Sequence, residues 1–348
     1  MVDKRITILM PVYNGAPFLR QAIESILDQS FPYFEFLIID DGSTDDTVSI
    51  INSYDDERIV FHQNERNLGI SATLNRGIEL ASCELIARMD SDDISYPDRL
   101  AKQYAYMVAN PDCAMVSSWA KVVTEDRRFV RLEKYRSPYY YYNLTFECWI
   151  YHPTIMFRKN NVVSVGMYGM PYSEDYDLFW KLSTKFRIAN IPEALVEYRL
   201  SNSSLNTVLK KVEYEEANEQ NVLRNIRYYM GDHFSISKPV LECLRHNFEP
   251  MVKRNDLREI FAALAMLDDI TEKIIEKDNP NRNVAAIDEA RFYKRQFIIT
   301  ELGKALPTLR AVLLLARTNS WLALYNISMN FMRWKIRRIK SLLMNISF

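Results

Sequence analysis

Three carboxylates, those of Asp90, Asp92 and Asp93, lie within four residues and closely follow an apolar run at residues 85–87. Carboxylates this close repel one another, and a divalent cation is the usual group that offsets the repulsion. Hard oxygen ligands at a strand end suit Mg²⁺ or Mn²⁺, which share their other coordination sites with phosphate and water. The cluster therefore predicts a site for a metal-bound diphosphate. The alternative is a solvated acidic turn that caps the helix expected from Pro97 onward.

Strands and helices alternate in the first part of the chain and must position these acids. Apolar runs predict strands at residues 6–10, 34–39, 58–62, 85–89 and 114–118. Helical spacing of apolar residues predicts helices at residues 17–29, 45–54, 71–80 and 97–108. This alternation implies βαβ units and a mostly parallel sheet, in which ligands bind at the carboxyl ends of the strands.

Two more polar loops are expected at the same sheet edge. Residues 11–14 follow the first strand, and residues 40–43 follow the second. A carboxylate of the second loop could accept hydrogen bonds from a nucleobase imide, and Tyr13 of the first offers a ring for stacking. Each loop alone is also explained as an ordinary turn, with an Asx-turn and a helix cap in the second. Three polar loops at one edge together favour a nucleotide site.

Composition limits the classes of protein. The 348 residues carry a formal net charge of −1, which gives no overall case for nucleic-acid binding, and 48% of them are hydrophobic. Four widely spaced cysteines predict buried free thiols in a reducing compartment. No apolar stretch is long enough for a signal segment or a membrane span, so we expect a cytoplasmic protein.

Glycine usage predicts two regions. Six of the eight glycines lie before residue 170, so loops with unusual backbone angles are concentrated there. From about residue 206 the chain has the spacing of long helices. We therefore expect a domain at residues 1–205 and a helical appendage at residues 206–348, which would serve as a membrane-surface or oligomerisation region.

As an ordered set, the motifs resemble those of the family-2 glycosyltransferases with the GT-A fold, which are inverting enzymes that use nucleotide-sugar donors. The resemblance covers roughly residues 4–205, and the matching segments are residues 11–14, 40–45, 67–69, 90–93 and 173–178. It implies an α/β fold of the GT-A type, with a Rossmann-like, mostly parallel sheet flanked by helices, followed by an all-helical C-terminal region.

The resemblance also implies roles for single residues. Pro11, Tyr13 and Asp41 match positions that hold the nucleobase. Asp90 matches the position at the ribose, and Asp92 matches the ligand of a Mn²⁺ or Mg²⁺ ion that bridges the diphosphate. Inverting transfer needs a base to deprotonate the attacking hydroxyl and a cation to stabilise the leaving diphosphate.

Residues nearer the acceptor are less clearly assigned. Asp175 matches the catalytic base of the family, with Glu174 beside it, although two acids at a helix start are also favoured by the helix dipole. His152 is expected either to face the active site or to be structural. Relatives often carry a histidine that joins the metal at the position of Ser201. Either Ser201, Asn202 or water completes the metal shell here, or the dependence on metal is weaker than usual.

Together these features predict a hexosyltransferase of polysaccharide biosynthesis that uses a UDP-sugar and a glycan or lipid-linked glycan acceptor. A sugar nucleotidyltransferase is the nearest enzymatic alternative, but it would need a glycine-rich basic loop after the first strand. A non-catalytic nucleotide- or glycan-binding module is the alternative from another class, and two intact acidic motifs argue against it.

The C-terminal segment suggests a further partner. Residues 302–348 contain eight Lys or Arg residues and no Asp or Glu. An apolar stripe with helical spacing lies among them, at Met332, Ile336, Ile339, Leu343 and Ile346. With Trp321 and Trp334, residues 321–346 have the pattern of a helix on an anionic membrane surface. Packing on the catalytic domain or on a second copy of the chain is the alternative.

We predict that the full-length protein co-sediments with anionic liposomes at low salt, and that removal of residues 329–348 abolishes this. Each Lys or Arg near an anionic surface contributes about 1 kcal/mol, and salt screens that attraction. Binding should therefore weaken at high salt. If the full-length protein ignores such vesicles, while truncation separates a dimer or lowers the melting temperature, the stripe is a packing surface.

Overall fold

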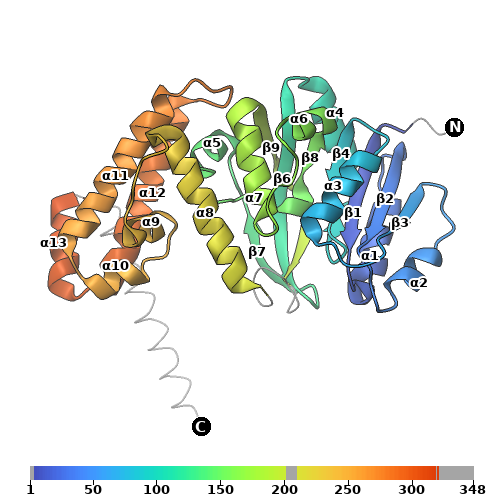
Figure 1. The fold of residues 1–348 in the computed structure, drawn as a ribbon, viewed down its shortest axis with the longest axis horizontal. Coiled ribbons are helices and arrows are strands. Elements are labelled where there is room, and N and C mark those ends of the chain that lie inside the picture. The colour runs from blue at the N-terminus through green and yellow to red at the C-terminus, as the bar shows by residue number, and fades with distance from the viewer. Residues whose placement is uncertain (1–3, 201–209, 319, 321–348) are drawn as a thin grey trace, which may run out of the picture. The chain divides into compact units, whose positions relative to one another are not determined.

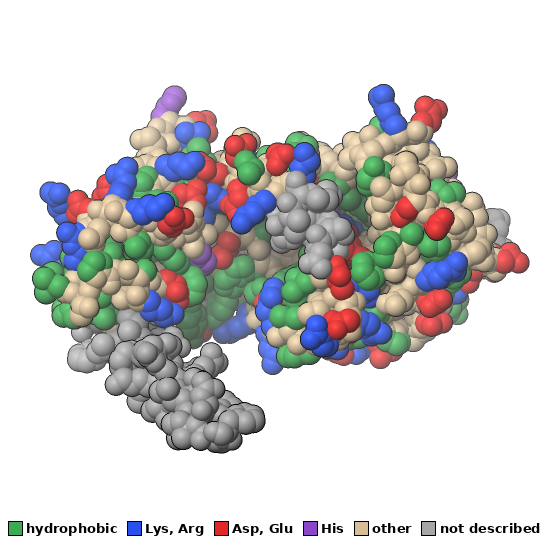
Figure 2. Space-filling view, turned by 90° about the horizontal axis from the view of Figure 1, so that it is seen from below, with side chains coloured by type: hydrophobic (Ala, Val, Ile, Leu, Met, Phe, Trp, Pro, Cys, Tyr) green, Lys and Arg blue, Asp and Glu red, His purple; other side chains and the backbone are tan. Residues whose placement is uncertain are grey.

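The computed structural model describes residues 4–200, 210–318 and 320 (Figure 1). The chain divides into two compact units. The first comprises Met1–Asn221 and Asp278–Arg282, and the second comprises Val222–Lys277 and Asn283–Phe348. Acidic and basic side chains are interspersed on the face shown in Figure 2, in keeping with the net charge of −1.

The described residues of the first unit form one nine-stranded mixed sheet. Its strand order is β3-β2-β1-β4-β8-β6-β9-β5, and β7 pairs with β6. The pairs β1–β2, β2–β3, β1–β4 and β6–β9 are parallel, and the other pairs are antiparallel. The strands are β1 (Ile6–Val12), β2 (Phe34–Asp40), β3 (Ile59–Gln63), β4 (Leu85–Arg88), β5 (Ile94–Ser95), β6 (Cys113–Thr124), β7 (Phe129–Glu133), β8 (Met156–Arg158) and β9 (Arg187–Leu200).

Helices flank this sheet, and their apolar faces form its core. Every residue of β1 and β2 is buried, as expected for parallel strands that are covered on both faces. Gly77 allows close packing of a helix on β1, since a Cβ there would lie 2.2 Å from a methyl of Leu9. The helices are α1 (Ala16–Leu27), α2 (Thr47–Asn52), α3 (Ile70–Leu80), α4 (Arg99–Ala109), α5 (Tyr140–Asn143), α6 (Lys159–Ser164), α7 (Glu174–Lys185) and α8 (Lys211–Met230), which continues into the second unit.

The strands and helices predicted up to residue 118 are confirmed, but the strand predicted at residues 114–118 runs from Cys113 to Thr124, and the short strand β5 was not predicted. The first strand extends to Val12, and the helix predicted at residues 45–54 is shorter, at Thr47–Asn52. His152–Thr154 is a 3₁₀ turn, where Pro153 has no backbone N–H to donate, and β8 follows it.

The second unit is helical throughout its described residues. Buried residues on α11 recur with helical spacing at Ile260, Leu264, Leu267 and Ile274, which explains how one face of this helix enters a core. The helices are α9 (Lys238–Leu244), α10 (Glu249–Arg254), α11 (Leu257–Glu276), α12 (Val284–Ala305) and α13 (Thr308–Thr318). The long helices predicted after residue 206 are therefore present.

Membrane spanning can be judged only for part of the chain. Within residues 4–200, 210–318 and 320, every helix is too short or too polar to span a lipid bilayer. The predicted apolar stripe and both of its tryptophans, at residues 321–346, lie outside the described residues. All four cysteines are described and are free thiols, but Cys148 is partly exposed, so the prediction of burial was wrong for that residue.

Candidate active site

The loops after β1 and β2 are bound to each other, as expected from their places in a parallel sheet. The backbone N–H of Asn14 donates to Ser43 Oγ at 2.8 Å, and the N–H of Thr44 donates to Asn14 Oδ1 at 2.9 Å. Gly15 N donates to Thr47 Oγ1 at 2.9 Å. Asn14 has a φ of 49°, a conformation that asparagine tolerates better than most residues. Tyr13 is 50% exposed beside these contacts, whereas Pro11 is buried in β1.

Asp41 holds a third loop against the first two. Its Oδ1 accepts from Asn64 Nδ2 at 2.7 Å and from the N–H of Leu68 at 2.9 Å, and its Oδ2 accepts from the N–H of Gly69 at 2.9 Å. A carboxylate has about four acceptor positions, so one position remains beyond these three bonds. Gly42 lets the third loop approach, since a Cβ there would lie 2.7 Å from the carbonyl carbon of Arg66.

The acidic cluster after β4 forms as predicted. One carboxylate oxygen from each of Asp90, Asp92 and Asp93 lies within 4.8 Å of the others. Burial, followed by the charge of Asp90, raises the pKa of Asp92 to about 6. Asp93 is buried, and its Oδ2 has no hydrogen-bond partner among the described residues. Three crowded acids with a free buried oxygen fit a divalent cation, so the residues present suit the predicted metal.

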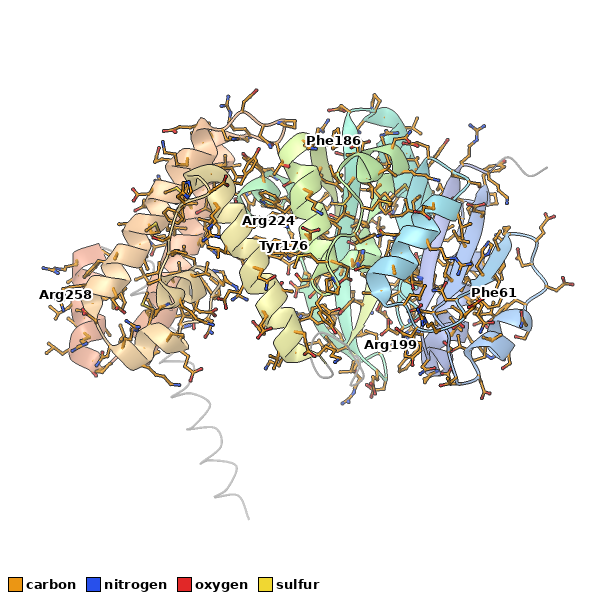
Figure 3. All side chains as sticks on the ribbon, in the orientation of Figure 1. Phe61, Tyr176, Phe186, Arg199, Arg224 and Arg258 are labelled. Atoms are coloured by element: carbon orange, nitrogen blue, oxygen red, sulfur yellow. The ribbon has the colours of Figure 1, made fainter. Side chains whose placement is uncertain are left out.

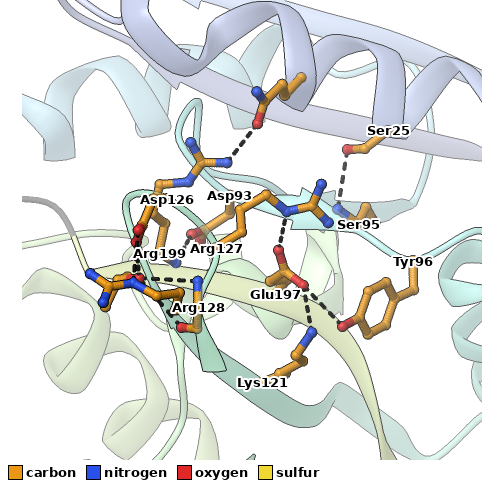
Figure 4. A network of polar contacts seen from close by, with 12 residues as sticks. Ser25, Asp93, Ser95, Tyr96, Lys121, Asp126, Arg127, Arg128, Glu197 and Arg199 are labelled. Atoms are coloured by element: carbon orange, nitrogen blue, oxygen red, sulfur yellow. Dashed lines mark hydrogen bonds and ion pairs between the residues drawn. The ribbon is translucent and has the colours of Figure 1, made fainter. Parts of the chain in front are cut away.

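Arg199, at the end of β9 (Figure 3), fixes Asp93 (Figure 4). Its backbone N–H donates to Asp93 Oδ1 at 2.7 Å, and its Nη2 donates to Gln21 Oε1 at 2.8 Å. Two residues earlier, the buried Glu197 accepts from Lys121 Nζ at 3.0 Å and from Arg127 Nε at 2.6 Å. These contacts anchor the end of β9 beside the acidic cluster.

Arg88 is a central residue that the sequence patterns did not single out. It is the last residue of β4, only 3% exposed, and it forms an ion pair with Asp90. Its charge also interacts with those of Glu174 and Asp175. The detectable signal is a cation that directly follows the apolar run at residues 85–87.

Glu174 and Asp175, the acidic pair, lie at the start of α7. Side chains of α8 hold the residue that precedes the pair. Ser173, which precedes the pair, has a φ of 54°, in the left-handed region. Its Oγ donates to Asn218 Oδ1 at 2.6 Å, and Asn221 Nδ2 donates to its carbonyl at 3.2 Å. Because a serine in this conformation is strained, such contacts are needed to hold it.

Burial shifts both acids of the pair toward protonation. Burial, followed by the charge of Asp175, raises the pKa of Glu174 to about 8, and burial also raises the pKa of Asp175. Glu174 is 5% exposed, and its Oε2 has no hydrogen-bond partner in the part of the chain that is described. Asp175 is partly exposed and accepts from the N–H of Tyr176 at 2.7 Å.

His152 lies close to Glu174 of this pair. Its Nε2 is 2.7 Å from the hydroxyl of Tyr168, and its Nδ1 is 3.9 Å from Glu174 Oε1. Burial, followed by the charge of Arg88, lowers the pKa of His152 well below its ordinary value, so its ring is neutral. Ser201 and Asn202, predicted as candidates for the metal shell, lie outside the described residues.

Tyr214 of α8 is another residue that the sequence patterns missed. Its ring packs on that of Tyr172 with centroids 5.2 Å apart. Burial, followed by the charges of Glu174 and Asp175, raises the pKa of its hydroxyl, which places Tyr214 in the field of the acidic pair. No local motif marks a residue that reaches a site from a separate helix.

This chain is similar to known glycosyltransferases. The family model for glycosyl transferase family 2 matches residues 7–170. The O-antigen biosynthesis glycosyltransferase WbnJ of Escherichia coli is 33% identical over 211 residues, which cover 57% of this chain and 81% of that protein. An uncharacterised glycosyltransferase of Methanocaldococcus jannaschii is 33% identical over 208 residues, which cover 57% of this chain and 71% of that protein.

Solved structures share the fold. TarS of S. aureus matches with a TM-score of 0.55 and 16% identity, covering 85% of this chain and 91% of that one. The mannosyltransferase PcManGT of Pyrobaculum calidifontis matches with a TM-score of 0.50 and 16% identity, covering 99% of this chain and 87% of that one. The mixed sheet flanked by helices, the ordered motifs and these relatives agree, and the chain belongs to glycosyltransferase family 2, with a GT-A fold and glycosyltransferase activity.

Proposed function

We propose that this glycosyltransferase moves a sugar from a nucleotide-diphosphate donor, a UDP-sugar, to a hydroxyl of a glycan or lipid-linked glycan, with inversion. The observation that carries the proposal is the meeting of two acidic motifs, one suited to a metal and one suited to a base, around the guanidinium of Arg88. WbnJ is named for O-antigen biosynthesis and AmsE of Erwinia amylovora for amylovoran biosynthesis, which supports a polysaccharide acceptor.

The donor side comprises the loops after β1, β2 and β4. We assign the nucleobase to Tyr13, Pro11 and Asp41, because Tyr13 presents an exposed ring and Asp41 retains an acceptor position. We assign Asp90 to the ribose. TarS has been solved with UDP-GlcNAc and PcManGT with GDP-Man and Mn²⁺, which supports a nucleotide-sugar donor of this general kind.

A divalent cation, Mn²⁺ or Mg²⁺, would be held by Asp92 with Asp90 alongside. When bound, it supplies positive charge to the leaving diphosphate. The protein's own part is to keep the ligand oxygens together. Arg199 orients Asp93 through its backbone N–H, and Arg88 orients Asp90 through their ion pair.

Asp175 is the proposed general base. The raised pKa of Glu174 leaves that side chain protonated at neutral pH, so one carboxylic acid and one carboxylate stand side by side. The carboxylate of Asp175 accepts the proton of the attacking hydroxyl. The hydroxyl oxygen then bonds to the anomeric carbon of the donor sugar as the bond between that carbon and the diphosphate breaks. His152 and Glu174 lie on the acceptor side as accessory groups.

We further propose that residues 1–205 form the catalytic domain and that residues 206–348 form an appendage. The appendage would bring the enzyme to the inner, anionic surface of the cell membrane through residues 321–346, where a lipid-linked acceptor is found. A second copy of the chain is the other candidate partner of this segment.

A donor screen tests the proposed function. The melting temperature would be measured with UDP, GDP and their sugar conjugates, each with and without Mn²⁺. We expect a rise with UDP that depends on Mn²⁺, because a ligand that binds only the folded state stabilises it. A rise with GDP alone would move the donor assignment to a guanosine nucleotide, and no rise with any nucleotide would refute the donor site.

Asp92→Ala should abolish metal-dependent UDP binding and nearly all transfer, because the carboxylate proposed to bind the metal is lost from the cluster. Titration of UDP in the presence of Mn²⁺ measures the effect. Asp55→Ala removes an exposed acid outside the cluster and should change neither property. Parental activity of Asp92→Ala in excess Mn²⁺ would contradict the metal assignment.

Asp175→Asn should leave donor affinity nearly intact and lower turnover by roughly 10²-fold or more, as expected when a general base is lost. The matched control is Asp177→Asn on the same helix, since that buried carboxylate pairs with Lys181 at 2.6 Å. The control should lose stability and keep turnover. If Asp175→Asn weakens the binding of UDP-sugar as much as it slows turnover, its role is structural.

Glu174→Gln should gain stability relative to the parent as pH rises from about 4.5 to about 8. The folded parent holds a proton on Glu174 in this range, whereas the unfolded chain releases it, so the parent's stability falls with rising pH. Urea unfolding near both ends of the range should show a relative gain of about 1 kcal/mol or more. For the exposed control Glu65→Gln, the free energy of unfolding should differ from that of the parent by the same amount at both pH values. The same result for Glu174→Gln would refute the raised pKa of Glu174.

A further inference from the structure

A carboxylate of β7 is held by three side chains that are at least partly exposed. Glu133 Oε2 accepts from the hydroxyl of Tyr135 at 2.7 Å, and its Oε1 accepts from the hydroxyl of Tyr151 at 3.2 Å and from Arg131 Nε. Arg131 Nη2 also donates to the Tyr151 hydroxyl at 3.1 Å. Burial alone would raise the pKa of Glu133, but hydrogen bonds from Arg131 and Tyr135 outweigh it. The pKa of Glu133 therefore lies below its ordinary value, and the side chain is ionised.

Two of these groups share one face of the sheet with Tyr198 of β9. Val122 of β6 pairs with Arg131 on one side and with Tyr198 on the other. Directly paired residues of neighbouring strands point to the same face, and so does Glu133, two residues further along β7. The rings of Tyr151 and Tyr198 meet edge to face, with centroids 4.7 Å apart. Both of these tyrosines are partly exposed.

Each of these two rings belongs to the residue next to a contact with one of the acidic motifs. Tyr198 directly precedes the arginine whose backbone N–H donates to Asp93 Oδ1 at 2.7 Å. Tyr151 directly precedes the histidine whose Nδ1 is 3.9 Å from Glu174 Oε1. An acceptor must present its hydroxyl close to both motifs, because it has to reach the base and the donor sugar together. The ring pair is therefore placed where an acceptor has to bind.

Aromatic rings beside an ionised carboxylate suit a saccharide. One face of a pyranose ring carries mostly C–H groups, which pack on the electron-rich face of an aromatic ring, whereas its hydroxyls need hydrogen-bond partners. A carboxylate has about four acceptor positions, and Arg131, Tyr135 and Tyr151 use three of those of Glu133, so one remains for a hydroxyl. Aromatic walls with a few placed polar groups are typical of binding sites for small molecules.

Fold stability alone does not explain this arrangement. Surface ion pairs contribute little to folding, yet three donors orient the single carboxylate of Glu133. A second ring pair widens the aromatic surface, since Trp149 stacks on Tyr135 with centroids 5.3 Å apart and an interplanar angle of 27°. Trp149 is also partly exposed. A ligand larger than a single hydroxyl group is therefore indicated.

We propose that Glu133, Tyr151 and Tyr198 form a subsite for a pyranose sugar of the glycan acceptor, with the C–H face of the sugar on the tyrosine rings and a hydroxyl on the carboxylate. The proposal rests on the proposed function, because the bound sugar is the acceptor whose hydroxyl Asp175 deprotonates. It adds a binding surface for the acceptor to the groups assigned to the donor and to the base.

The test measures sugar binding without any transfer. Methyl glycosides of glucose, galactose, mannose and N-acetylglucosamine are titrated into the full-length protein, and binding is followed by saturation-transfer difference NMR. We expect at least one glycoside to bind at millimolar concentration. Its strongest saturation should fall on the C–H protons of one sugar face, because those protons lie against the tyrosine rings.

Glu133→Gln should weaken this binding about tenfold or more, because a hydrogen bond to a charged group is lost. Tyr151→Leu should also weaken it and should remove the preference for one sugar face. Two matched controls should bind glycosides as the parent does. Glu193→Gln changes an acid of β9 that pairs with Lys102, and Tyr33→Leu removes a ring that is 50% exposed just before β2.

Glycoside binding that survives in both Glu133→Gln and Tyr151→Leu would overturn the proposal, and so would a parent that binds none of the four glycosides. If the melting temperature shows that one variant does not fold, the other decides. UDP binding measured on the same samples separates this subsite from the donor site. A parent that binds a glycoside through Glu133 but no UDP would refute the donor site and support the subsite, whereas UDP binding without glycoside binding would refute the subsite alone.

Discussion

The repulsion between carboxylates that are largely shielded from water is the constraint on which the rest of this structure depends. Five carboxylates interact around the guanidinium of Arg88, those of Asp90, Asp92, Asp93, Glu174 and Asp175. A buried acid is stable only when it is paired, hydrogen-bonded or protonated. All three solutions occur here. Asp90 pairs with Arg88, Asp93 accepts a backbone N–H, and Glu174 has its pKa raised to about 8.

The fold provides those solutions from elements that are far apart in sequence. β4 lies between β1 and β8, and Arg88 lies opposite Leu9 of β1. The buried Arg99 donates to the carbonyls of Arg88 and Ile155 at 2.7 and 3.2 Å, which ties β4 to the chain before β8. α8 holds Ser173 in its left-handed conformation and so fixes where the acidic pair begins. Contacts from distant elements thereby hold the loop of Asp90 to Asp93 and the start of α7 in place.

Sequence patterns predicted the parts that depend on local signals. Apolar runs and polar loops located β1 to β4 and the cluster at Asp90 to Asp93, whereas the pair at the start of α7 was located by the family resemblance. Contributions from distant elements were not predicted, because no local pattern shows that the backbone of Arg199 will meet Asp93 or that Tyr214 will face the acidic pair. Arg88 was visible as a cation after an apolar run, but its role depends on the acids that surround it in space.

The most direct measurement is a crystal structure with UDP and Mn²⁺, with data collected to locate manganese by its anomalous scattering. We expect one manganese peak in contact with Asp92, and the diphosphate beside it on the side of the α7 acidic pair. Manganese bound away from residues 90–93, or a diphosphate so far from Asp175 that no sugar could bridge them, would contradict the proposed site.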